Sequence, residues 1–387
     1  MPKMRKVVLL INPSREHTRG LLKGIAKYSR IQGVWTFYRP LEYRQRKDKR
    51  KLLPVLAAVK PDGILMREPV DIEQIVRMGT PAVSFPYTRE KIPGIANVIT
   101  DHIAVGEMAA KHLLDRGFRR FAYCGFDDWW WSRLRGEGLR KTVAQAGFET
   151  SFYKLPRAKS KRSLDKELPI IAEWLMSLPK PIGLMTCNDD RGELVIGACK
   201  IAGVQVPQEI AIVGVDNDRL ICDLSSPPLS SIALSVEKAG YEAAALLDKM
   251  MADEKPPSYE IYIQPTHVVT RQSTDILAID DRDVAEAVRF IRSHAKRAIY
   301  VDSVVDAVPL SRRVLEKRFR TILGHSIHDE IRRVRVELIV QMLAETQMPI
   351  SDIADALEFP SVAHISRYFS KEKGMSPLKY RRLYIHS

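Results

Sequence analysis

The stretch "PLSRRVLEKRFR", from Pro309 to Arg320, has the pattern of an amphipathic helix with an unusually basic outer face. Leu315, Phe319 and the following Ile322 are spaced i, i+4 and i+7, which predicts a buried stripe. The side chains expected on or beside the opposite face are Arg312, Arg313, Glu316, Lys317 and Arg320. Five basic residues within nine positions, opposed by one glutamate, favour a polyanionic partner over an ordinary solvated face.

The segment before this stretch completes a recognisable unit. Residues 301–308 predict a short helix capped by Asp302, and Pro309-Leu310 predicts a turn. Ser311 is expected to cap the basic helix that follows. Helix, short turn and basic helix form the helix-turn-helix arrangement, whose second helix enters the major groove of DNA.

A second unit repeats this pattern about fifty residues later. "FPSVAHISRYFSK" (359–371) predicts a helix capped by Ser361 with Ile365 and Phe369 buried. The helix before it is expected to begin at Ser351. The outward-facing residues are Ala363, His364, Ser366, Arg367 and Ser370. A long helix, 326–344, connects the two units, so both recognition helices can reach successive major-groove segments on one face of DNA.

The chain before residue 276 is built differently. Short apolar runs alternate with helix-length amphipathic segments, for example the segment 103–117, which is expected to end at Gly117. The runs that predict strands are 6–11, 63–65, 82–85, 120–125, 183–187 and 210–215. This alternation predicts parallel sheets with helices on both faces, in two lobes.

Polar residues follow several of these predicted strands, where ligands bind in open α/β sheets. They are Asn12, Asp127, Asp128, Asn188, Asp189, Asp190, Asp216, Asn217 and Asp218, and Trp129, Trp130 and Trp131 lie beside one set. Any single Asp or Asn could simply cap the next helix. Together with the indoles, they favour a sugar pocket, because carboxylates and amides bind hydroxyls and aromatic faces cover the apolar side of a sugar ring.

Composition excludes several other classes of protein. With 387 residues, 45% of them apolar, the chain is long enough for two or three globular domains, and its net charge of +14 is compatible with binding nucleic acid. The basic run from Arg44 to Lys51 is interpreted as a solvated helix end. The first apolar run, of five residues, is too short for a signal peptide, and no run of membrane-spanning length follows, so we expect a cytoplasmic protein.

No enzymatic chemistry is predicted. No nucleotide-binding glycine motif follows any strand, and the four cysteines show neither CxxC pairing nor metal-ligand spacing. We therefore expect no catalytic residue, no metal site and no cofactor. Some modules like the C-terminal one belong to methyl-transfer repair proteins that use a cysteine nucleophile, but all four cysteines here precede residue 223.

The C-terminal part resembles an AraC-type DNA-binding domain. "SRRVLEKRF" is similar to the first recognition helix of that family, and "FPSVAHISRYFSKEKGMSPLKYRR" to its closing signature. Pro309 and Glu358 stand where glycines are usual at the two turns. The resemblance implies double-stranded DNA with paired half-sites as a partner, and RNA polymerase as a further candidate.

The first 275 residues resemble a LacI/GalR-type effector domain, itself similar to periplasmic sugar-binding proteins. The similar stretches are "VITDHIAVGEMAAKHLLDRGFRRFAYCG", "CNDDRGELVIGACKIAGVQVPQEIAIVGVDND", "SSPPLSSI" and "VVTRQST". Carried over residue by residue, the family's effector contacts fall on Asp101, Arg135, Asn188 or Asp189, and Asp216, with the loop 12–19 closing one side. A salt bridge from Arg135 to Glu137 or Asp128 is the alternative interpretation of that arginine.

The expected layout is an effector domain in residues 1–275, a linker in 276–280 and a DNA-binding domain in 281–387. The order of the two domains is similar to that in regulators of xylose operons, and the resemblance covers nearly the whole chain. The resemblance implies a homodimer that responds to a pentose, D-xylose first. Another sugar or a nucleoside as effector, or an effector domain that serves only for dimerisation, are the alternatives.

Overall fold

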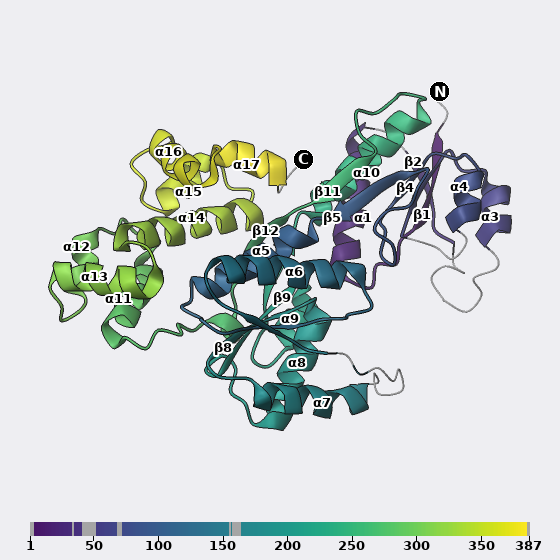
Figure 1. Cartoon of the computed structure of the whole chain (residues 1–387). Helices are drawn as coiled ribbons and strands as arrows, with labels where there is room; N and C mark the ends of the chain where they lie inside the picture. The colour runs from purple at the N-terminus through teal and green to yellow at the C-terminus, as the bar shows by residue number, and fades with distance from the viewer. Residues whose placement is uncertain are drawn as a thin grey trace.

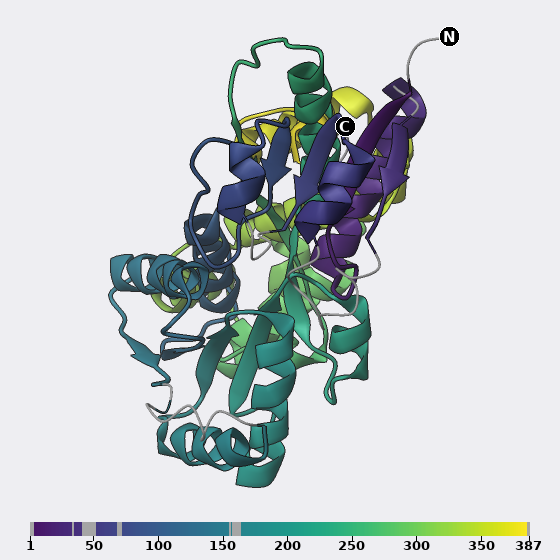
Figure 2. The same ribbon diagram turned by 90° about the vertical axis from the view of Figure 1, so that its right-hand side faces the viewer.

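The computed structural model describes residues 4–32, 35–40, 52–67, 72–154, 156 and 164–384, and the basic run 44–51 lies outside these ranges. The described chain forms two α/β lobes followed by a helical module (Figure 1). In the turned view the two lobes lie one above the other (Figure 2). The two-lobed α/β fold and the all-helical C-terminal part that the sequence predicts are confirmed.

The N-terminal lobe is a six-stranded parallel sheet in the order β11-β5-β4-β3-β1-β2. Its strands are β1 (Arg5–Leu10), β2 (Trp35–Tyr38), β3 (Gly63–Met66), β4 (Ala82–Ser84), β5 (Ala96–Thr100) and β11 (Glu260–Ile263). Its helices are α1 (Glu16–Gln32), α3 (Leu52–Val59), α4 (Ile72–Arg77) and α10 (Val236–Met251). Every residue of β3 is buried, as expected for a strand covered by helices on both faces.

The C-terminal lobe has a second six-stranded sheet, in the order β12-β10-β9-β8-β6-β7, parallel except for the edge strand β12. Its strands are β6 (Phe121–Cys124), β7 (Thr150–Phe152), β8 (Ile182–Thr186), β9 (Ile210–Val215), β10 (Ser230–Leu234) and β12 (Pro265–Val269). Its helices are α5 (His102–Leu114), α6 (Trp130–Gln145), α7 (Leu164–Ser177), α8 (Asp189–Ala202) and α9 (Arg219–Leu224), and the 3-10 turn η3 (Gln272–Thr274) follows β12.

The chain passes between the lobes three times, and the three crossings lie side by side. They are at Asp101 after β5, at Ser235 after β10 and at Gln264 between β11 and β12. Ser235 N donates to Gln264 O over 2.9 Å, and Gln264 N donates to the Ser235 hydroxyl over 2.9 Å. Asp101 N donates to Ile263 O over 2.9 Å. These bonds join the crossings into one hinge.

Two glycines allow α5 and α6 to pack backbone against backbone. A Cβ added at Gly106 of α5 would lie 2.1 Å from Arg135 O, and one added at Gly138 of α6 would lie 2.2 Å from Ile103 O. Side chains at either position would force the helices apart. The pair therefore behaves as one rigid unit.

The helical module consists of α11 (Arg282–His294), α12 (Val301–Asp306), α13 (Arg312–Leu323), α14 (Ile327–Glu345), α15 (Ile350–Ala356), α16 (Val362–Lys373) and α17 (Pro377–Tyr384). It has two hydrophobic cores, one for each helix-turn-helix unit. Leu315 and Phe319 of α13 are buried in the first, and Ile365 and Phe369 of α16 in the second, as the sequence predicts. The connector α14 contributes apolar side chains to both cores.

Several predicted caps are wrong. Asp302 lies inside α12, which begins at Val301, and its carboxylate pairs with Arg312. Ser351 lies inside α15, whose N-cap is Pro349. Ser311 occupies the N-cap of α13 without a side-chain capping bond, whereas Ser361 caps α16 by accepting from His364 N.

The ends of two other elements also depart from the sequence-based expectation. Helix α5 ends at Leu114 with Asp115 as C-cap, and Gly117 takes a left-handed conformation two residues later. Glu358, where glycine is usual, has a φ of +53°. Its carboxylate accepts a hydrogen bond from Ala298 N over 3.2 Å. This bond holds the turn against the loop that follows α11.

The segment between the two domains is packed on both sides. Ile276 and Ala278 contact the core of the C-terminal lobe, whereas Leu277 and Ile279 contact the first core of the helical module. Ala278 N donates to Arg116 O over 2.8 Å. The alternation is that of an extended chain with two buried faces.

We predict that Gly106→Ala lowers the free energy of unfolding of the effector domain by about 1–3 kcal/mol, because the new methyl group collides with backbone atoms of α6. Gly197→Ala on α8 is the matched control, since its Cβ would meet only Leu168 Cδ2 at 3.6 Å. All five tryptophans precede residue 276, so urea unfolding followed by tryptophan fluorescence reports on this domain. Equal stability of the two variants would contradict the packing argument.

A hydrogen bond in the turn between α13 and α14 predicts that the stability of the protein depends on pH. His325 Nε2 and Glu330 Oε2 are 2.9 Å apart, and this hydrogen bond raises the pKa of His325. A raised histidine pKa contributes stability that is complete below the unfolded pKa and is lost as pH rises through the folded pKa. Compared with His325→Gln, the wild-type protein should therefore lose its stability advantage as the pH rises above the ordinary histidine pKa of about 6.5. Urea midpoints from far-ultraviolet circular dichroism at several pH values measure this difference, and a constant difference would contradict it.

Candidate functional site

A cavity of about 260 Å³ lies between the two lobes, at the carboxyl ends of their strands. The N-terminal lobe lines it with Arg15, Glu16, His17, Arg67, Phe85, Pro86, Tyr87, Val98, Ile99, Thr100 and Ile263. The C-terminal lobe contributes His102, Trp130, Trp131, Arg135, Asn188, Asp189, Asp190, Asp216, Asp218 and Ile221. The residues that the sequence predicts for a ligand site are only partly brought together here. Those in the lining are Arg135, Asn188, Asp189, Asp190, Asp216, Asp218, Trp130 and Trp131. Those not among the lining residues are Asn12, Asp101, Asp127, Asp128, Trp129 and Asn217.

Polar contacts connect the lobes across the mouth of this cavity. Arg15 pairs with Asp190 at 2.7 Å, and Arg19 with Asp218 at 3.1 Å. Trp130 Nε1 donates to the backbone oxygen of Tyr87 over 3.1 Å. The loop 12–19 therefore closes one side of the cavity, as expected from the sequence.

Arg135 is buried and fixed on three sides. Its guanidinium donates to His102 Nδ1 over 3.3 Å and to the backbone oxygen of Cys187, and it lies 3.5 Å from Asp216 Oδ1. Glu137, the alternative partner, pairs instead with Arg140 and Lys141. Two of these partners, His102 and Asp216, line the cavity themselves, so Arg135 is held at its wall.

Three of the predicted site residues also perform structural tasks. Asp101 caps α5 by accepting from Ala104 N, and Asn188 caps α8 by accepting from Arg191 N. Both carboxylate oxygens of Asp189 are occupied, one by Asp218 N at 2.7 Å and the other by the Ser231 hydroxyl at 2.6 Å. Burial raises the pKa of Asp189 well above its usual range.

Aromatic rings form one wall of the cavity. Tyr87 packs against Trp129 and Trp131 with centroids 4.8 and 5.7 Å apart, and the guanidinium of Arg67 lies 4.5 Å from the centre of the Tyr87 ring. Trp131 Nε1 is buried and has no hydrogen-bond partner among the described residues, and the same holds for His17 Nδ1. Two buried polar atoms at one cavity, a donor and a ring nitrogen, suit a ligand that offers hydroxyl groups.

Both histidines at the cavity are neutral. Burial, with the nearby charges of Arg67 and Arg135, lowers the pKa of His17 to about 3. Burial and Arg135 also lower the pKa of His102 well below its usual value. His17, Arg67 and Tyr87 were not predicted individually from the sequence. The available signal was their position after β1, β3 and β4, where ligand contacts are expected.

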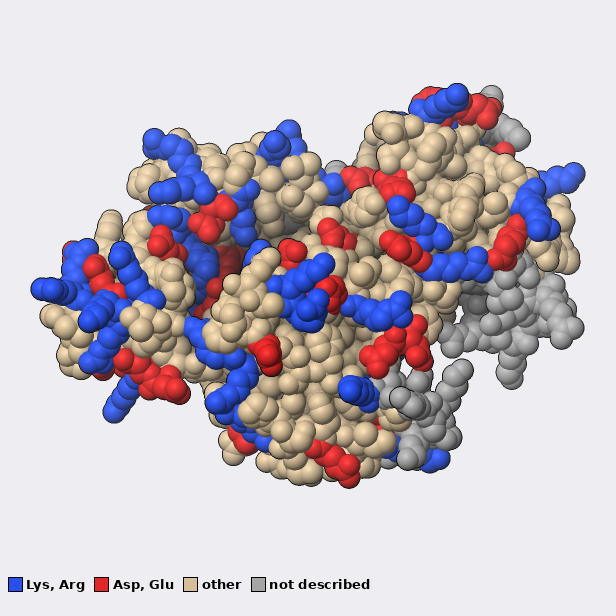
Figure 3. Space-filling model, viewed as in Figure 1, with Lys and Arg blue, Asp and Glu red and all other residues tan. Residues whose placement is uncertain are grey.

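The outer face of α13 carries exposed cations. The side chains of Arg313, Lys317 and Arg320 form no hydrogen bond or ion pair with any residue that the structure describes, although the backbone oxygen of Lys317 accepts from the Thr321 hydroxyl. Arg312, in contrast, is paired with Asp302 at 2.8 Å and Glu316 at 3.1 Å. In Figure 3 blue side chains project outward over the region of α12 and α13. The predicted basic face is thus present, with Arg312 at its edge.

The second unit presents fewer charges. Arg367 of α16 is exposed and has no partner within the described ranges, whereas Ser366 is half-buried. The His364 ring lies 5.8 Å from that of Phe359, at the start of the helix. Both recognition helices are exposed along their outer sides, which docking into DNA requires.

Other chemistries find little support in the described residues. Cys124, Cys187, Cys199 and Cys222 are buried, and burial raises the pKa of each thiol, which disfavours the nucleophilic thiolate. No group of three or more potential ligands in the described ranges could hold a metal ion. Among the helices that the structure describes, none is long and apolar enough to cross a bilayer.

Comparisons with known proteins agree with this division into two parts. Residues 110–274 match a periplasmic binding protein-like domain, and residues 304–383 match a helix-turn-helix domain. The xylose operon regulatory protein of Escherichia coli strain K12 is 30% identical over 98% of this chain and 97% of its own length. That of Haemophilus influenzae is 29% identical over 97% of this chain and 98% of its own length.

Solved structures give the same result. The structure of xylose-binding transcription activator xylR aligns over 100% of both chains, with 28% identity and a TM-score of 0.61. The transcriptional regulator CelR in complex with cellobiose shares the fold over 70% of this chain and 86% of its own, with 22% identity and a TM-score of 0.56. The chain belongs to the family of the xylose operon regulatory proteins, transcription regulators in which a periplasmic-binding-protein-like domain precedes an AraC-type helix-turn-helix domain.

Proposed function

We propose that this protein is a sugar-responsive transcription regulator whose effector is a pentose, with D-xylose as the first candidate. The sugar binds between the two lobes, and a homodimer presents α13 and α16 to operator DNA with paired half-sites. The protein acts in the cytoplasm and is not an enzyme. The observation that carries the proposal is the interlobe cavity, which has an aromatic wall and two buried polar atoms without partners.

The cavity is suited to hydroxyl groups at several points. Trp131 and His17 both line the cavity, and each has a ring nitrogen without a hydrogen-bond partner among the described residues, which a hydroxyl group could satisfy. Arg135 offers a rigid fork whose donors can bond two adjacent hydroxyls. The indole and phenol faces cover the C–H side of a sugar ring. We propose these residues, with Trp130, Asn188, Asp189 and Asp216, as the effector site, and Asp101 as the cap that fixes the start of α5.

The charges favour a neutral ligand. The lining residues include five carboxyl groups, three guanidinium groups and two neutral imidazoles. The carboxylates are paired with arginines: Asp190 with Arg15, Glu16 and Asp218 with Arg19, and Asp216 with Arg135. A phosphorylated sugar would compete with these pairs, at an electrostatic cost. A neutral pentose meets no such cost. The relatives' names, which refer to the xylose operon and to xylose binding, support D-xylose over other pentoses.

For the effector, we predict that D-xylose binds with a measurable heat in calorimetry and that Arg135→Ala weakens this binding at least about tenfold. Losing a charge-assisted hydrogen bond costs about 1.5–3 kcal/mol, which corresponds to about a 10- to 150-fold change in Kd. L-arabinose, D-ribose and D-glucose are titrated in parallel to establish which sugar the site prefers.

Arg140→Ala is the matched control for this titration. Arg140 lies on the same helix, is exposed and pairs with Glu137 outside the cavity. Unchanged binding in Arg140→Ala with weakened binding in Arg135→Ala supports the site. No heat from any of the four sugars would refute the pentose proposal.

For DNA, we predict that Arg313→Ala reduces affinity for a preferred duplex more than for random-sequence DNA, by about 1–3 kcal/mol at one base position. The duplex is one recovered by selection from a random pool with the wild-type protein. The reason is that Arg313 is exposed and unpaired within the described structure, so its fork is available for a guanine edge. Fluorescence anisotropy at several salt concentrations separates base contacts from phosphate contacts.

Lys141→Ala on α6 removes the same charge far along the chain from α13 and serves as the control. It should leave both affinities nearly unchanged. An Arg313→Ala variant that weakened all DNA sequences equally would instead assign this side chain to phosphate binding. Failure of the wild-type protein to select any sequence would refute the DNA-binding proposal.

A further inference from the structure

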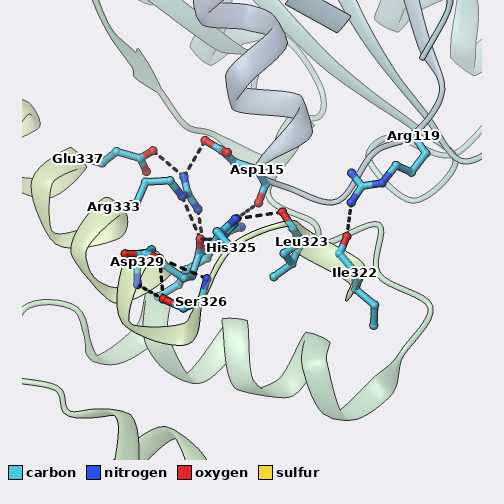
Figure 4. A network of polar contacts seen from close by, with 11 residues as sticks. Asp115, Arg119, Ile322, Leu323, His325, Ser326, Asp329, Arg333 and Glu337 are labelled. Carbon is cyan, nitrogen blue, oxygen red and sulfur yellow. Dashed lines mark hydrogen bonds and ion pairs between the residues drawn. The ribbon is translucent and has the colours of Figure 1, made fainter. Parts of the chain in front are cut away.

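The helical module is docked against the C-terminal lobe at the carboxyl end of α5. Arg333 of α14 pairs with Asp115, the C-cap of α5, at 2.9 Å, and Arg292 of α11 donates to the backbone oxygen of Asp115 over 3.3 Å. Nearby, Arg119 donates to the backbone oxygen of Ile322 near the end of the recognition helix α13. Figure 4 shows these contacts between the end of α5 and the turn from α13 to α14. One helix end of the effector domain thus touches the elements that position α13.

Arg333 is the centre of this docking contact. Besides Asp115 it pairs with Glu330 at 2.6 Å and with Glu337 at 2.7 Å, and Glu330 in turn bonds His325. The side chains of Arg333 and Glu330 are only 17% and 1% exposed. Glu330 and Glu337 lie on the same helix as Arg333 and hold its guanidinium in place, so that it is directed at Asp115 across the contact. The contact therefore has a defined geometry, unlike an exposed surface pair.

The opposite end of α5 lies at the effector cavity. His102, its first residue, lines the cavity and accepts from Arg135, and Asp101 caps the helix at the hinge. Helix α5 has 13 residues and so spans about 20 Å as a straight rod. Its close packing on α6, which carries Trp131 and Arg135, ties it to the aromatic wall of the cavity. A change at the cavity and a change at Asp115 therefore occur on the two ends of one rigid unit.

A second docking contact lies directly after the hinge. Tyr380 of α17 donates its hydroxyl hydrogen to Thr266 O over 3.1 Å, and Glu345 at the end of α14 lies 3.7 Å from His267. Both Thr266 and His267 belong to β12, which begins one residue after the crossing at Gln264. The connector α14 is thus held near its start through Arg333 and at its end beside the hinge strand.

We infer that the effector signal reaches the DNA-binding module through α5 and β12, with Asp115–Arg333 and Tyr380–Thr266 as the two contacts that set the position of α14. This inference rests on the proposed function. Sugar that bridges the lobes fixes the hinge and the start of α5. The two contacts then favour one placement of α14 and, with it, one orientation of α13 and α16 relative to the lobes. A ligand shifts such an equilibrium only by its differential interaction with the two placements, which these contacts can provide.

The test uses the full-length protein with Asp115→Asn, Tyr380→Phe and the double variant. Each substitution removes one docking interaction while keeping the shape of the side chain. D-xylose affinity is measured by calorimetry, and the affinity for the selected duplex is measured by anisotropy with and without saturating D-xylose. The informative quantity is the ratio of the two DNA dissociation constants, whose usual range for coupled sites is about 5- to 150-fold.

We expect the sugar affinity of all variants to stay within about twofold of the wild type, while the ratio falls at least about threefold in each single variant and approaches one in the double variant. Asp115→Glu, which keeps the charge, should retain more of the ratio than Asp115→Asn. Glu137→Gln, which removes an exposed pair on α6, should leave the ratio unchanged.

The outcomes separate the inference from the proposed function. A double variant that keeps the wild-type ratio overturns the inference and leaves the proposed function intact. A wild-type protein that binds no sugar, or whose DNA affinity sugar does not change, overturns the proposed function and the inference together. Loss of sugar affinity in Asp115→Asn would also overturn the inference, because the substitution would then act on the effector domain itself.

Discussion

The hinge of three hydrogen-bonded crossings is the constraint on which the other features depend. Because Asp101, Ser235 and Gln264 are joined side by side, the two sheets can only meet with the carboxyl ends of their strands facing each other. The cavity forms there. The first crossing leads directly into α5 and the third into β12, and these are the two elements on which the helical module docks. Effector site and docking site are thus neighbours of the same hinge, although they lie far apart in the sequence.

The sequence predicted six of the eight interior strands and none of the four edge strands of the two sheets. The fully buried strands, such as β3 and β9, were predicted because both faces are apolar. All four edge strands, β2, β7, β11 and β12, were missed, since an edge strand needs fewer apolar residues. The interior strand β5 was also missed, although four of its five residues are buried. Strand β10 was missed because Ser230 and Ser231 are buried in it, and their hydroxyl groups bond to Arg271 O and Asp189. A predicted cap failed where a stronger partner competed, as Arg312 does for Asp302.

The effector site was predictable in outline for a similar reason. Strand ends identify the residues that face the cleft, so Asp216 could be assigned to it before the structure was known. Arg135 lies on α6 and was assigned only through the resemblance to LacI/GalR-type effector domains. The roles of His17 and Trp131 could not be predicted from the sequence. They depend on the finding that one ring nitrogen of each side chain has no hydrogen-bond partner among the described residues, which only the structure shows. The same applies to Asp189, whose two oxygens are occupied by Asp218 N and Ser231. Its carboxylate shapes the site by holding two neighbouring segments together.

The linker has a consequence for the history of such two-domain proteins. Ile276 and Ala278 pack on the effector domain and Leu277 on the helical module, whereas Ile279 packs on the module and also lies against Gly117 of the C-terminal lobe. Inserting one residue would exchange the two sides, whereas inserting two would preserve them. The two domains are therefore not connected by a flexible linker that would tolerate any length. A recombination event that joined a new effector domain to this DNA-binding module would have to keep the linker apolar. It would also have to change the linker length only by an even number of residues.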